Sequence, residues 1–363
     1  MPLLTPWFSP AEHIPSLDGI KRKTHSRRGE EADSGHFFFA AGSAALRARP
    51  GVENTVMTSP TFGPATGDPA HRGMPGRGPN PEMSTTEPRS ERFTTASLDG
   101  VTLHALHRGR GDAPKLVLLH GGGANAHWWD HLAPTLAGDF HVVALDFRGH
   151  GDSDHPEQLE VAAFERDLDA LLAHLNAPDA ILMGHSMGAH VAVGRAARAP
   201  GPRAVVAVEF SRGGQRGARR RARLALAARR TYASRAEAAR RFQFLPAAPA
   251  ADESLRAAIA EHSLRPEPDG RFGYKFDARW FAQGRGASPP LEQVTCPTLL
   301  IRGASSTLLT AEGAAELVAR IPNATLAEIP GGGHNVHLEC PDEVLAATLA
   351  FLRPFRRPNG PER

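Results

Sequence analysis

A stretch of ten residues near the middle of the chain, 180–189 with the sequence AILMGHSMGA, constrains the fold more than any other. A short apolar run ends there in a Gly-x-Ser-x-Gly pentad, and a helical pattern follows. The stretch predicts a strand, a tight turn and a helix, with Ser186 at the apex of the turn. The crowded backbone of such a turn leaves no room for side chains at Gly184 and Gly188. A chain with 36 glycines also produces such pentads by chance. Whether Ser186 is a nucleophile therefore depends on whether the chain also offers residues that could act with it.

Short apolar strand patterns alternate with amphipathic helix patterns from about residue 92 onwards. Strands are predicted at 115–119, 141–145, 180–183, 204–208, 298–301 and 325–329, after a hairpin of strands 92–98 and 101–107 around Asp99-Gly100. Helices are predicted at 164–175, 189–199, 311–320 and 343–352, with a further helical pattern that follows a glycine loop and ends at Leu136. This alternation is typical of the α/β class, in which helices flank a mostly parallel sheet on both faces. Ligands of such folds bind at the carboxyl ends of the strands.

The alternation stops between the strands predicted at 204–208 and 298–301. Residues 211–290 are helical or irregular, rich in arginine at first and in aromatic residues later. An insertion at this place predicts a helical lid over the strand ends. The arginines between 212 and 230 are expected to form a solvated helix face. The alternative is a surface for an anionic substrate or an acidic carrier protein.

Residues 1–90 have no sustained periodicity and are crowded with Pro, Gly, Ser, Thr and charged residues. This composition predicts a disordered extension, or one mis-assigned at its start, because Met83 opens a segment that leads directly into the first strand pattern. Basic residues at 21–28 before the apolar run 37–46 loosely resemble a signal peptide, but acidic residues intervene between them. The folded domain is therefore expected to cover 91–363.

Composition limits the classes of partner. The 41% of hydrophobic residues suffices for a large core. The formal net charge of only +3 does not indicate a surface that binds nucleic acid. No apolar run approaches the roughly 20 residues that span a bilayer, so no membrane partner is expected. Two cysteines, Cys296 and Cys340, cannot build a disulfide framework. A cytoplasmic location is expected on these grounds.

A serine hydroxyl needs a base to take its proton, and His334 is the candidate base. It follows three glycines, Gly331 to Gly333, directly after the last predicted strand. A glycine loop there can carry an imidazole over the sheet edge toward Ser186. The N-H of Met187, at the start of the helix, is available to a developing oxyanion.

These motifs, in this order, resemble the α/β-hydrolase family over about residue 92 to the end. The resemblance rests on four segments: His120-Gly-Gly-Gly123, Asp146-x-Arg-Gly-His-Gly-x-Ser153, Gly184-x-Ser-x-Gly188 and Gly333-His-x-x-His-Leu-Glu339. It implies an eight-stranded sheet and an oxyanion hole made by the backbone N-H groups of Gly122 and Met187. Glycine at 122 is also suited to close approach of a substrate carbonyl.

The acid is where this chain departs from the family pattern. Members commonly carry an Asp in the loop after the seventh strand, where this chain has Ser306 or Thr307. Some members take the acid from the end of the sixth strand, which here is Glu209. A carboxylate directly after an apolar run is costly to bury unless it has a partner, and a histidine is a suitable one. Glu209 is therefore the predicted acid.

Metal and nucleotide sites are the competing interpretations. Residues 127–131, His-Trp-Trp-Asp-His, come close to the inverted zinc motif H-x-x-E-H, but Asp replaces Glu and no third ligand is evident. The glycine loop lacks the ending of a phosphate cradle, and no dinucleotide fingerprint opens a helix. No cofactor and no metal are predicted.

The sequence thus predicts a serine hydrolase that cleaves a carboxylic ester or a related acyl bond of a small molecule, which is anionic if the arginines bind it. Ser186 is the predicted nucleophile, His334 the base and Glu209 the acid. One alternative is hydrolysis of carbon–carbon bonds in ring-cleavage products, because residues 120–126 resemble the oxyanion segment of those enzymes. The other is a ligand-binding member of the family without catalytic activity.

Overall fold

A computed structural model describes residues 87–158, 160, 162–211, 230–282 and 288–356 of the chain. The segments on which the extension and signal-peptide hypotheses depend, including Met83, lie outside these residues. The first described strand begins at Arg89, near the boundary predicted at residue 91.

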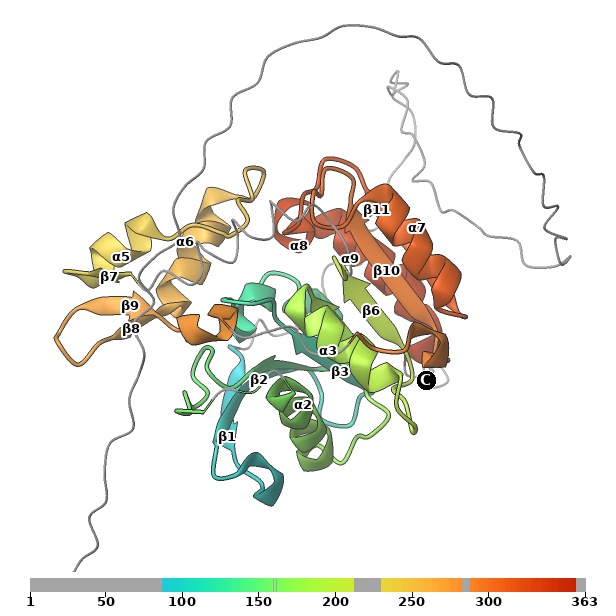
Figure 1. Cartoon of the computed structure of the whole chain (residues 1–363), viewed down its shortest axis with the longest axis horizontal. Coiled ribbons are helices and arrows are strands. Elements are labelled where there is room, and N and C mark those ends of the chain that lie inside the picture. The colour runs from blue at the N-terminus through green and yellow to red at the C-terminus, as the bar shows by residue number, and fades with distance from the viewer. Residues whose placement is uncertain (1–86, 159, 161, 212–229, 283–287, 357–363) are drawn as a thin grey trace, which may run out of the picture. The chain divides into compact units, whose positions relative to one another are not determined.

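A sheet of eight strands forms the centre of the described fold (Figure 1). In spatial order its strands are β1 (Arg89–Phe93), β2 (Leu103–Arg108), β4 (His141–Asp146), β3 (Lys115–Leu119), β5 (Ile181–His185), β6 (Val205–Val208), β10 (Thr298–Gly303) and β11 (Ala324–Ile329). The β1–β2 and β2–β4 pairs are antiparallel, and every other pair is parallel. The predicted α/β class with a mostly parallel sheet is confirmed.

Alternate side chains of the central strands enter two separate cores, one on each face of the sheet. Val117 and Leu119 of β3 pack into the core beneath α2 (Ala163–His174), α3 (Met187–Ala196) and α7 (Ala311–Arg320). Leu116 and Leu118 pack into the opposite core, beneath η2 (Ala126–Trp129), α1 (Ala133–Leu136) and α9 (Pro341–Leu352). Burial on both faces explains why these strands read as continuous apolar runs.

Two local predictions near the start of the domain are wrong in detail. The hairpin exists, with Phe93 opposite Leu103, but β1 ends at Phe93 and a 3-10 turn, η1 (Ala96–Leu98), follows it. Leu98 is fully buried in the core, which draws the chain out of the strand. The helix pattern that ends at Leu136 is broken into η2 and α1: Asn125 caps η2, and a proline is the second residue of α1.

The insertion between β6 and β10 contains a small sheet that the sequence analysis did not predict. Its described part comprises β7 (Thr231–Tyr232), α5 (Arg235–Arg241), α6 (Glu253–His262), β8 (Leu264–Pro266), β9 (Phe272–Tyr274) and η3 (Ala278–Ala282), with strand order β7-β9-β8. A turn at Asp269-Gly270 joins β8 to β9, and Gly270 has a φ of 77°. Asp-Gly between short strands is a hairpin signal. The prediction of helical and irregular structure in this insertion is therefore corrected, because its described part also contains strands.

The insertion contacts the rest of the fold through polar and apolar groups. Asn125 Nδ2 donates to Ser263 Oγ at 3.0 Å, and Asn335 Nδ2 donates to the carbonyl of Pro246 at 2.6 Å. Trp128 packs against Phe242 and Phe244. The arginines at 212, 216, 219–221, 223 and 229, on which the predicted solvated face depends, lie outside the described residues.

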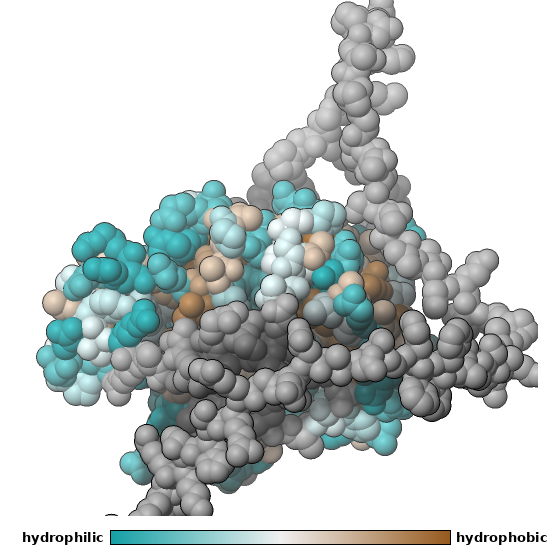
Figure 2. All heavy atoms as spheres, turned by 45° about the horizontal axis from the view of Figure 1, so that its top comes forward, coloured by the Kyte–Doolittle hydropathy of each residue, from teal (hydrophilic) through white to brown (hydrophobic). Residues whose placement is uncertain are grey.

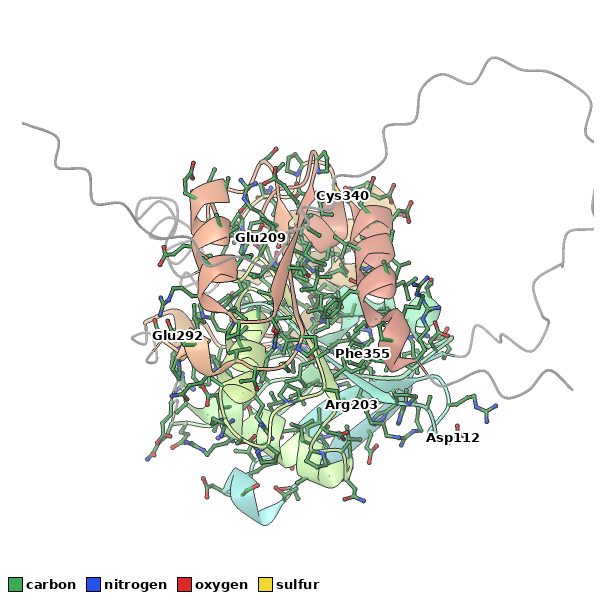
Figure 3. The ribbon with its side chains drawn as sticks, turned by 90° about the vertical axis from the view of Figure 1, so that its right-hand side faces the viewer. Asp112, Arg203, Glu209, Glu292, Cys340 and Phe355 are labelled. Atoms are coloured by element: carbon green, nitrogen blue, oxygen red, sulfur yellow. The ribbon has the colours of Figure 1, made fainter. Side chains whose placement is uncertain are left out.

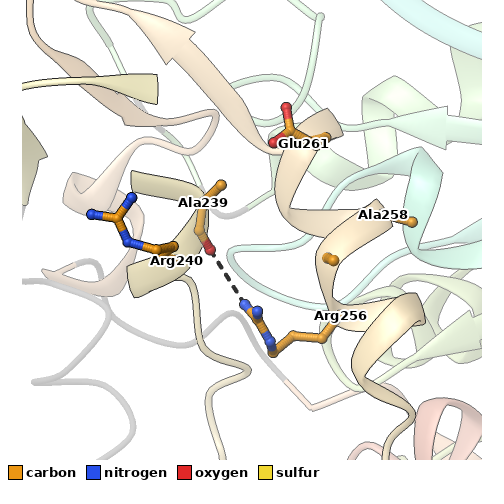
Figure 4. Close-up of a pocket in the computed structure, with 6 residues that line it drawn as sticks. Ala239, Arg240, Arg256, Ala258 and Glu261 are labelled. Atoms are coloured by element: carbon orange, nitrogen blue, oxygen red, sulfur yellow. Dashed lines mark hydrogen bonds between the residues drawn. The ribbon is translucent and has the colours of Figure 1, made fainter. Parts of the chain in front are cut away.

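A cavity of 340 Å³ lies within the insertion, between α5 and α6 (Figure 4). Arg256 crosses it to donate to the carbonyl of Ala239 at 3.3 Å. None of the predicted site residues lines this cavity. The face of the domain seen in Figure 2 is mainly hydrophilic, with scattered apolar residues. Among the described helices, none is both long and apolar enough to cross a membrane.

The remaining elements lie near the end of the chain. They are η4 (Leu291–Gln293), α8 (Val336–Glu339) and η5 (Arg353–Phe355). Helix α8 follows directly on the glycine loop behind β11, and this loop brings His334 to the carboxyl edge of the sheet.

Candidate active site

Ser186 occupies a strained turn between β5 and α3. Its φ of 49° and ψ of −106° are sparsely populated backbone angles for a residue with a side chain. The turn is too tight for side chains around it: a Cβ on Gly184 would lie 2.4 Å from the Gly188 backbone, and one on Gly188 would lie 2.2 Å from the Leu119 carbonyl oxygen. The two glycines therefore permit the sharp turn that presents Ser186.

His334 faces Ser186 from the loop that follows β11. Its Nε2 lies 3.1 Å from Ser186 Oγ. The loop crosses β10 closely, since a Cβ on Gly303 would lie 2.3 Å from the Gly333 carbonyl oxygen. The absence of a side chain at Gly303 thus allows the loop that carries His334 to pass close to the end of β10.

Glu209 lies in the interior at the end of β6, with 1% of its surface exposed (Figure 3). Its Oε2 is 2.9 Å from Nδ1 of His334. The residue has a φ of 55°, a left-handed conformation that is unusual for glutamate. Ser186, His334 and Glu209, three residues far apart in the sequence, therefore form one continuous chain of hydrogen bonds.

The Glu209 carboxylate also accepts hydrogen bonds from Gly303 and Ser306. Gly303 N-H donates to Oε1 at 2.8 Å, and the Ser306 hydroxyl donates to Oε2 at 2.6 Å. Burial nevertheless raises the pKa of Glu209 to about 8, while the bonds from Ser306 and Gly303 act in the opposite direction. The ionised carboxylate satisfies these donors and also accepts the Nδ1–H of His334.

The protonation state of Glu209 determines which nitrogen of His334 can accept a proton. With Glu209 ionised, Nδ1 carries the hydrogen and Nε2 offers its lone pair to Ser186. A protonated Glu209 would donate to Nδ1 and leave the hydrogen on Nε2. That tautomer has no lone pair on Nε2, so His334 can accept a proton from Ser186 only when Glu209 is ionised.

Ser306 is a residue whose contribution the sequence analysis missed. It stands in the loop after β10, where an acid is common in the family. In the structure its hydroxyl contacts Glu209, the predicted acid. The sequence did contain a signal for this contact. Since β6 and β10 are parallel neighbours, the residues that follow them, Glu209 and Ser306, lie in loops that begin at the same edge of the sheet.

Two further side chains hold the loop that carries His334. Nε2 of the buried His185 lies 2.9 Å from the backbone carbonyl of His334 and donates to it. A carboxylate oxygen of Glu339 accepts the N-H of Gly333 at 2.8 Å. Burial lowers the pKa of His185 to about 3, so this ring is a neutral donor at physiological pH. These contacts explain why a histidine precedes Ser186 and a glutamate follows His334 in the motifs.

Gly122 and Met187 remain the predicted oxyanion donors. Met187 is the first residue of α3, whose first N-H groups have no acceptor within the helix. Gly122 lies in the turn after β3, and a Cβ on the preceding Gly121 would lie 3.6 Å from Cβ of Ser186. The segment that contains Gly122 therefore passes close to Ser186.

The other polar motif residues support the loops around the site. The buried Asp146 accepts the N-H of Ala126 at 2.6 Å and pairs with His104 at 2.7 Å. Arg148 pairs with the buried Asp167 at 2.7 Å. These contacts join the end of β4 to the segment that follows the glycine loop and to β2, and the loop after β4 to α2.

The residues of the near-zinc motif at 127–131 diverge in the structure. His131 Nε2 donates to the backbone carbonyl of His337 at 2.7 Å, whereas His127 Nδ1 pairs with Asp130 at 2.6 Å. The two histidines of the motif therefore serve different partners. A histidine from the insertion, His262, lies against His127 instead.

Comparison with known proteins relates this arrangement to a family. The model of the alpha/beta hydrolase family matches residues 116–347. The 2-(acetamidomethylene)succinate hydrolase of Mesorhizobium japonicum is 30% identical over 280 residues, which cover 72% of this chain and 96% of that protein. An esterase of Mycobacterium tuberculosis is 30% identical over 263 residues, covering 67% and 84%. An sn-1-specific diacylglycerol lipase of Mus musculus is 27% identical over 258 residues, covering 67% and 82%.

Solved structures agree with this relationship. The crystal structure of E-2-(acetamidomethylene)succinate hydrolase matches with a TM-score of 0.65 at 28% sequence identity, covering 74% of this chain and all of that chain. The family match and these named relatives support hydrolase activity. The chain belongs to the alpha/beta hydrolase family.

Proposed function

We propose that this protein is a serine hydrolase that cleaves a carboxylic ester or a related acyl bond of a small molecule through an acyl-enzyme. The observation that carries the proposal is the hydrogen-bond chain from Ser186 Oγ through His334 to Glu209, with steps of 3.1 and 2.9 Å. In this proposal Ser186 attacks the carbonyl, His334 takes and returns the proton, and Glu209 stabilises the imidazolium.

The developing oxyanion is assigned to the backbone N-H groups of Gly122 and Met187. Preorganised N-H donors of this kind are worth roughly 3–4 kcal/mol each in transition-state stabilisation. No step of this mechanism needs a cofactor or a metal ion. The insertion, whose described part spans residues 230–282, is proposed as the lid that covers the substrate.

A fluorophosphonate probe tests the nucleophile directly. Such a probe reacts with an activated serine, so we expect stoichiometric labelling of Ser186 and none in the Ser186→Ala variant. His334→Gln should slow the labelling strongly while leaving the fold intact. Absence of labelling in well-folded protein would instead favour the ligand-binding alternative without catalytic activity.

The substrate is proposed to be anionic, which is supported by the name of one relative. The Mesorhizobium protein is a hydrolase of a substituted succinate, and succinate is a dicarboxylate. A panel of matched neutral and carboxylate-bearing esters tests this, with higher kcat/KM expected for the carboxylate series. Hydrolysis of the substituted succinate itself, without ester activity, would favour the carbon–carbon alternative or another bond in that class of substrate.

A further inference from the structure

Two buried asparagines beside the candidate active site donate hydrogen bonds to the insertion. Asn335 directly follows His334 and is 1% exposed, and its Nδ2 donates to the carbonyl oxygen of Pro246 at 2.6 Å. Asn125 lies in the segment after the glycine loop and is 2% exposed, and its Nδ2 donates to Ser263 Oγ at 3.0 Å. Each of the two segments that carry predicted site residues is therefore fastened to the insertion by one asparagine.

The partners of the two asparagines fix the direction of both hydrogen bonds. The carbonyl oxygen of Pro246 can only accept, so it is Nδ2 of Asn335 that faces it. Oδ1 of Asn125 accepts a backbone N-H at 3.0 Å, which leaves the amide nitrogen to donate. The hydroxyl of Ser263 gives its own hydrogen to the carbonyl of Ile259 at 2.7 Å, so its oxygen is available as an acceptor. Both contacts are complete donor–acceptor pairs.

Apolar residues of the same two segments pack against the insertion. Ala124 belongs to the segment after the glycine loop, and Leu338 belongs to α8, which follows His334. Both are buried in one cluster with Phe242 and Phe244 of the insertion. The insertion thus contacts each segment through a hydrogen bond and through apolar packing.

The loop that carries His334 is held on both sides of that residue. On one side, the N-H of Gly333 donates to a carboxylate oxygen of Glu339 at 2.8 Å. Burial raises the pKa of Glu339, and the N-H groups of Gly333 and of Ala250, in the insertion, act in the opposite direction. On the other side, Asn335 is bonded to the insertion directly. A loop with three successive glycines has little stiffness of its own, so these contacts set the position of the imidazole.

We propose that Asn335 and Asn125 are positioning residues that couple the insertion to the segments carrying His334 and Gly122. While the insertion is seated on both amides, the imidazole is held within reach of Ser186. When the insertion lifts away, both segments lose a hydrogen-bond partner together, and a buried amide without a partner is unfavourable. The effect of this coupling on turnover rests on the proposed hydrolase function, whereas the coupling itself does not.

Hydrogen–deuterium exchange of the full chain, followed by mass spectrometry, tests the coupling without a substrate. In Asn335→Ala we expect amide exchange in residues 246–262 to be about 2- to 10-fold faster, because loss of one hydrogen bond weakens the seat of the insertion. Asn323→Ala is the matched control, since it removes an amide that donates to the carbonyl of Thr295, also at 2.6 Å, where β10 and β11 begin. Exchange equal to that of the wild type would overturn the proposal.

A substitution on the insertion side tests whether the effect is transmitted. Ser263→Ala removes the acceptor of Asn125, and the peptide that contains His334 should then exchange faster, although the substitution lies in the insertion. Circular dichroism checks that each variant is folded, and Ser263→Ala decides the matter if Asn335→Ala is not. Unchanged exchange of the His334 peptide in folded Ser263→Ala would show that the two contacts act separately, against the proposal.

The rate of fluorophosphonate labelling at Ser186 connects the coupling to the reaction. Asn335→Ala should label about 10- to 100-fold more slowly, because a displaced His334 is a poorer base, and Asn323→Ala should label at the wild-type rate. The pH profile of kcat should keep its shape in Asn335→Ala, since the charge of Glu209 is untouched. Faster exchange with normal labelling would make Asn335 a purely structural contact and overturn its positioning role. Unlabelled wild-type protein would instead refute the proposed function, and exchange alone would then decide the coupling.

Discussion

The hydroxyl oxygen of Ser306 lies 2.6 Å from Oε2 of Glu209, and Nδ1 of His334 faces the same carboxylate oxygen at 2.9 Å. The N-H groups of Leu308 and Leu309 point at the Ser306 oxygen, at 3.3 and 3.2 Å. These donors leave the hydroxyl hydrogen free to be given to Glu209. The loop after β10 carries no acid at this place, yet it contributes a hydrogen bond to the acid on β6.

Replacing Ser306 should impair turnover more than substrate binding. In Ser306→Ala the Glu209 carboxylate loses a donor that lowers its pKa, so less of it is ionised at neutral pH. Loss of one hydrogen bond to a charged group predicts a kcat about 10- to 100-fold lower, with KM little changed. The pH profile of kcat should move to higher pH, and Ser306→Thr should restore both kcat and the profile. An unshifted profile in Ser306→Ala would show that the hydroxyl only fills space.

Removing the charge of Glu209 should lower kcat far more than the Ser306→Ala substitution does. Glu209→Gln keeps the size of the side chain, but an amide cannot stabilise the imidazolium, and kcat is expected to fall by about 10³- to 10⁴-fold. Glu312→Gln is the matched control, since Glu312 is exposed at the first turn of α7. Steady-state kinetics on both variants make the comparison. Near-normal turnover in Glu209→Gln would move the acid role to another residue.

Activity and stability should respond to pH in opposite directions. Burial raises the pKa of Glu209 from an ordinary 4.5 to about 8, so the folded protein binds this proton more tightly than the unfolded chain does. Activity that needs the ionised form should rise as the pH passes through about 8. The contribution of this group to stability is complete at low pH and is lost as the pH rises from about 4.5 to about 8.

Urea unfolding at several pH values measures the stability half of this prediction. Over that window the free energy of unfolding should fall by at most about 1.4 kcal/mol per pH unit from Glu209 alone. The same series on Glu209→Gln should have a shallower slope. If wild type and variant show parallel pH dependence, Glu209 is already ionised throughout the range.

The turn at Ser186 should not tolerate a methyl group at Gly188. A Cβ there would lie 2.2 Å from the carbonyl oxygen of Leu119, which is backbone and cannot move without shifting β3. Gly188→Ala is expected to destabilise the protein by about 2–4 kcal/mol and to abolish probe labelling. Gly111→Ala is the control, because its added Cβ meets nothing within 4 Å. Thermal unfolding of the two variants would reveal equal stability if the turn can relax.

Much of the sheet could be predicted because its signals are local. The central strands are buried on both faces, so each reads as an apolar run, and α7 was predicted at its observed bounds, Ala311–Arg320. The small sheet of the insertion was missed because β7, β8 and β9 have only two or three residues each. Strands that short carry no periodicity, and only Asp269-Gly270 marks the turn between two of them.

The sequence by itself determined the fold class and indicated Ser186, His334 and Glu209 as candidate site residues. It could do so because strand patterns, glycines at a tight turn and the order of the loops are visible in short stretches of sequence. The tertiary structure alone decided how Ser306 and His185 act, because their partners lie 97 and 149 residues away along the chain. It also decided that His262, and not His131, lies beside His127. Such contacts arise from the packing of distant segments, and no local pattern encodes them.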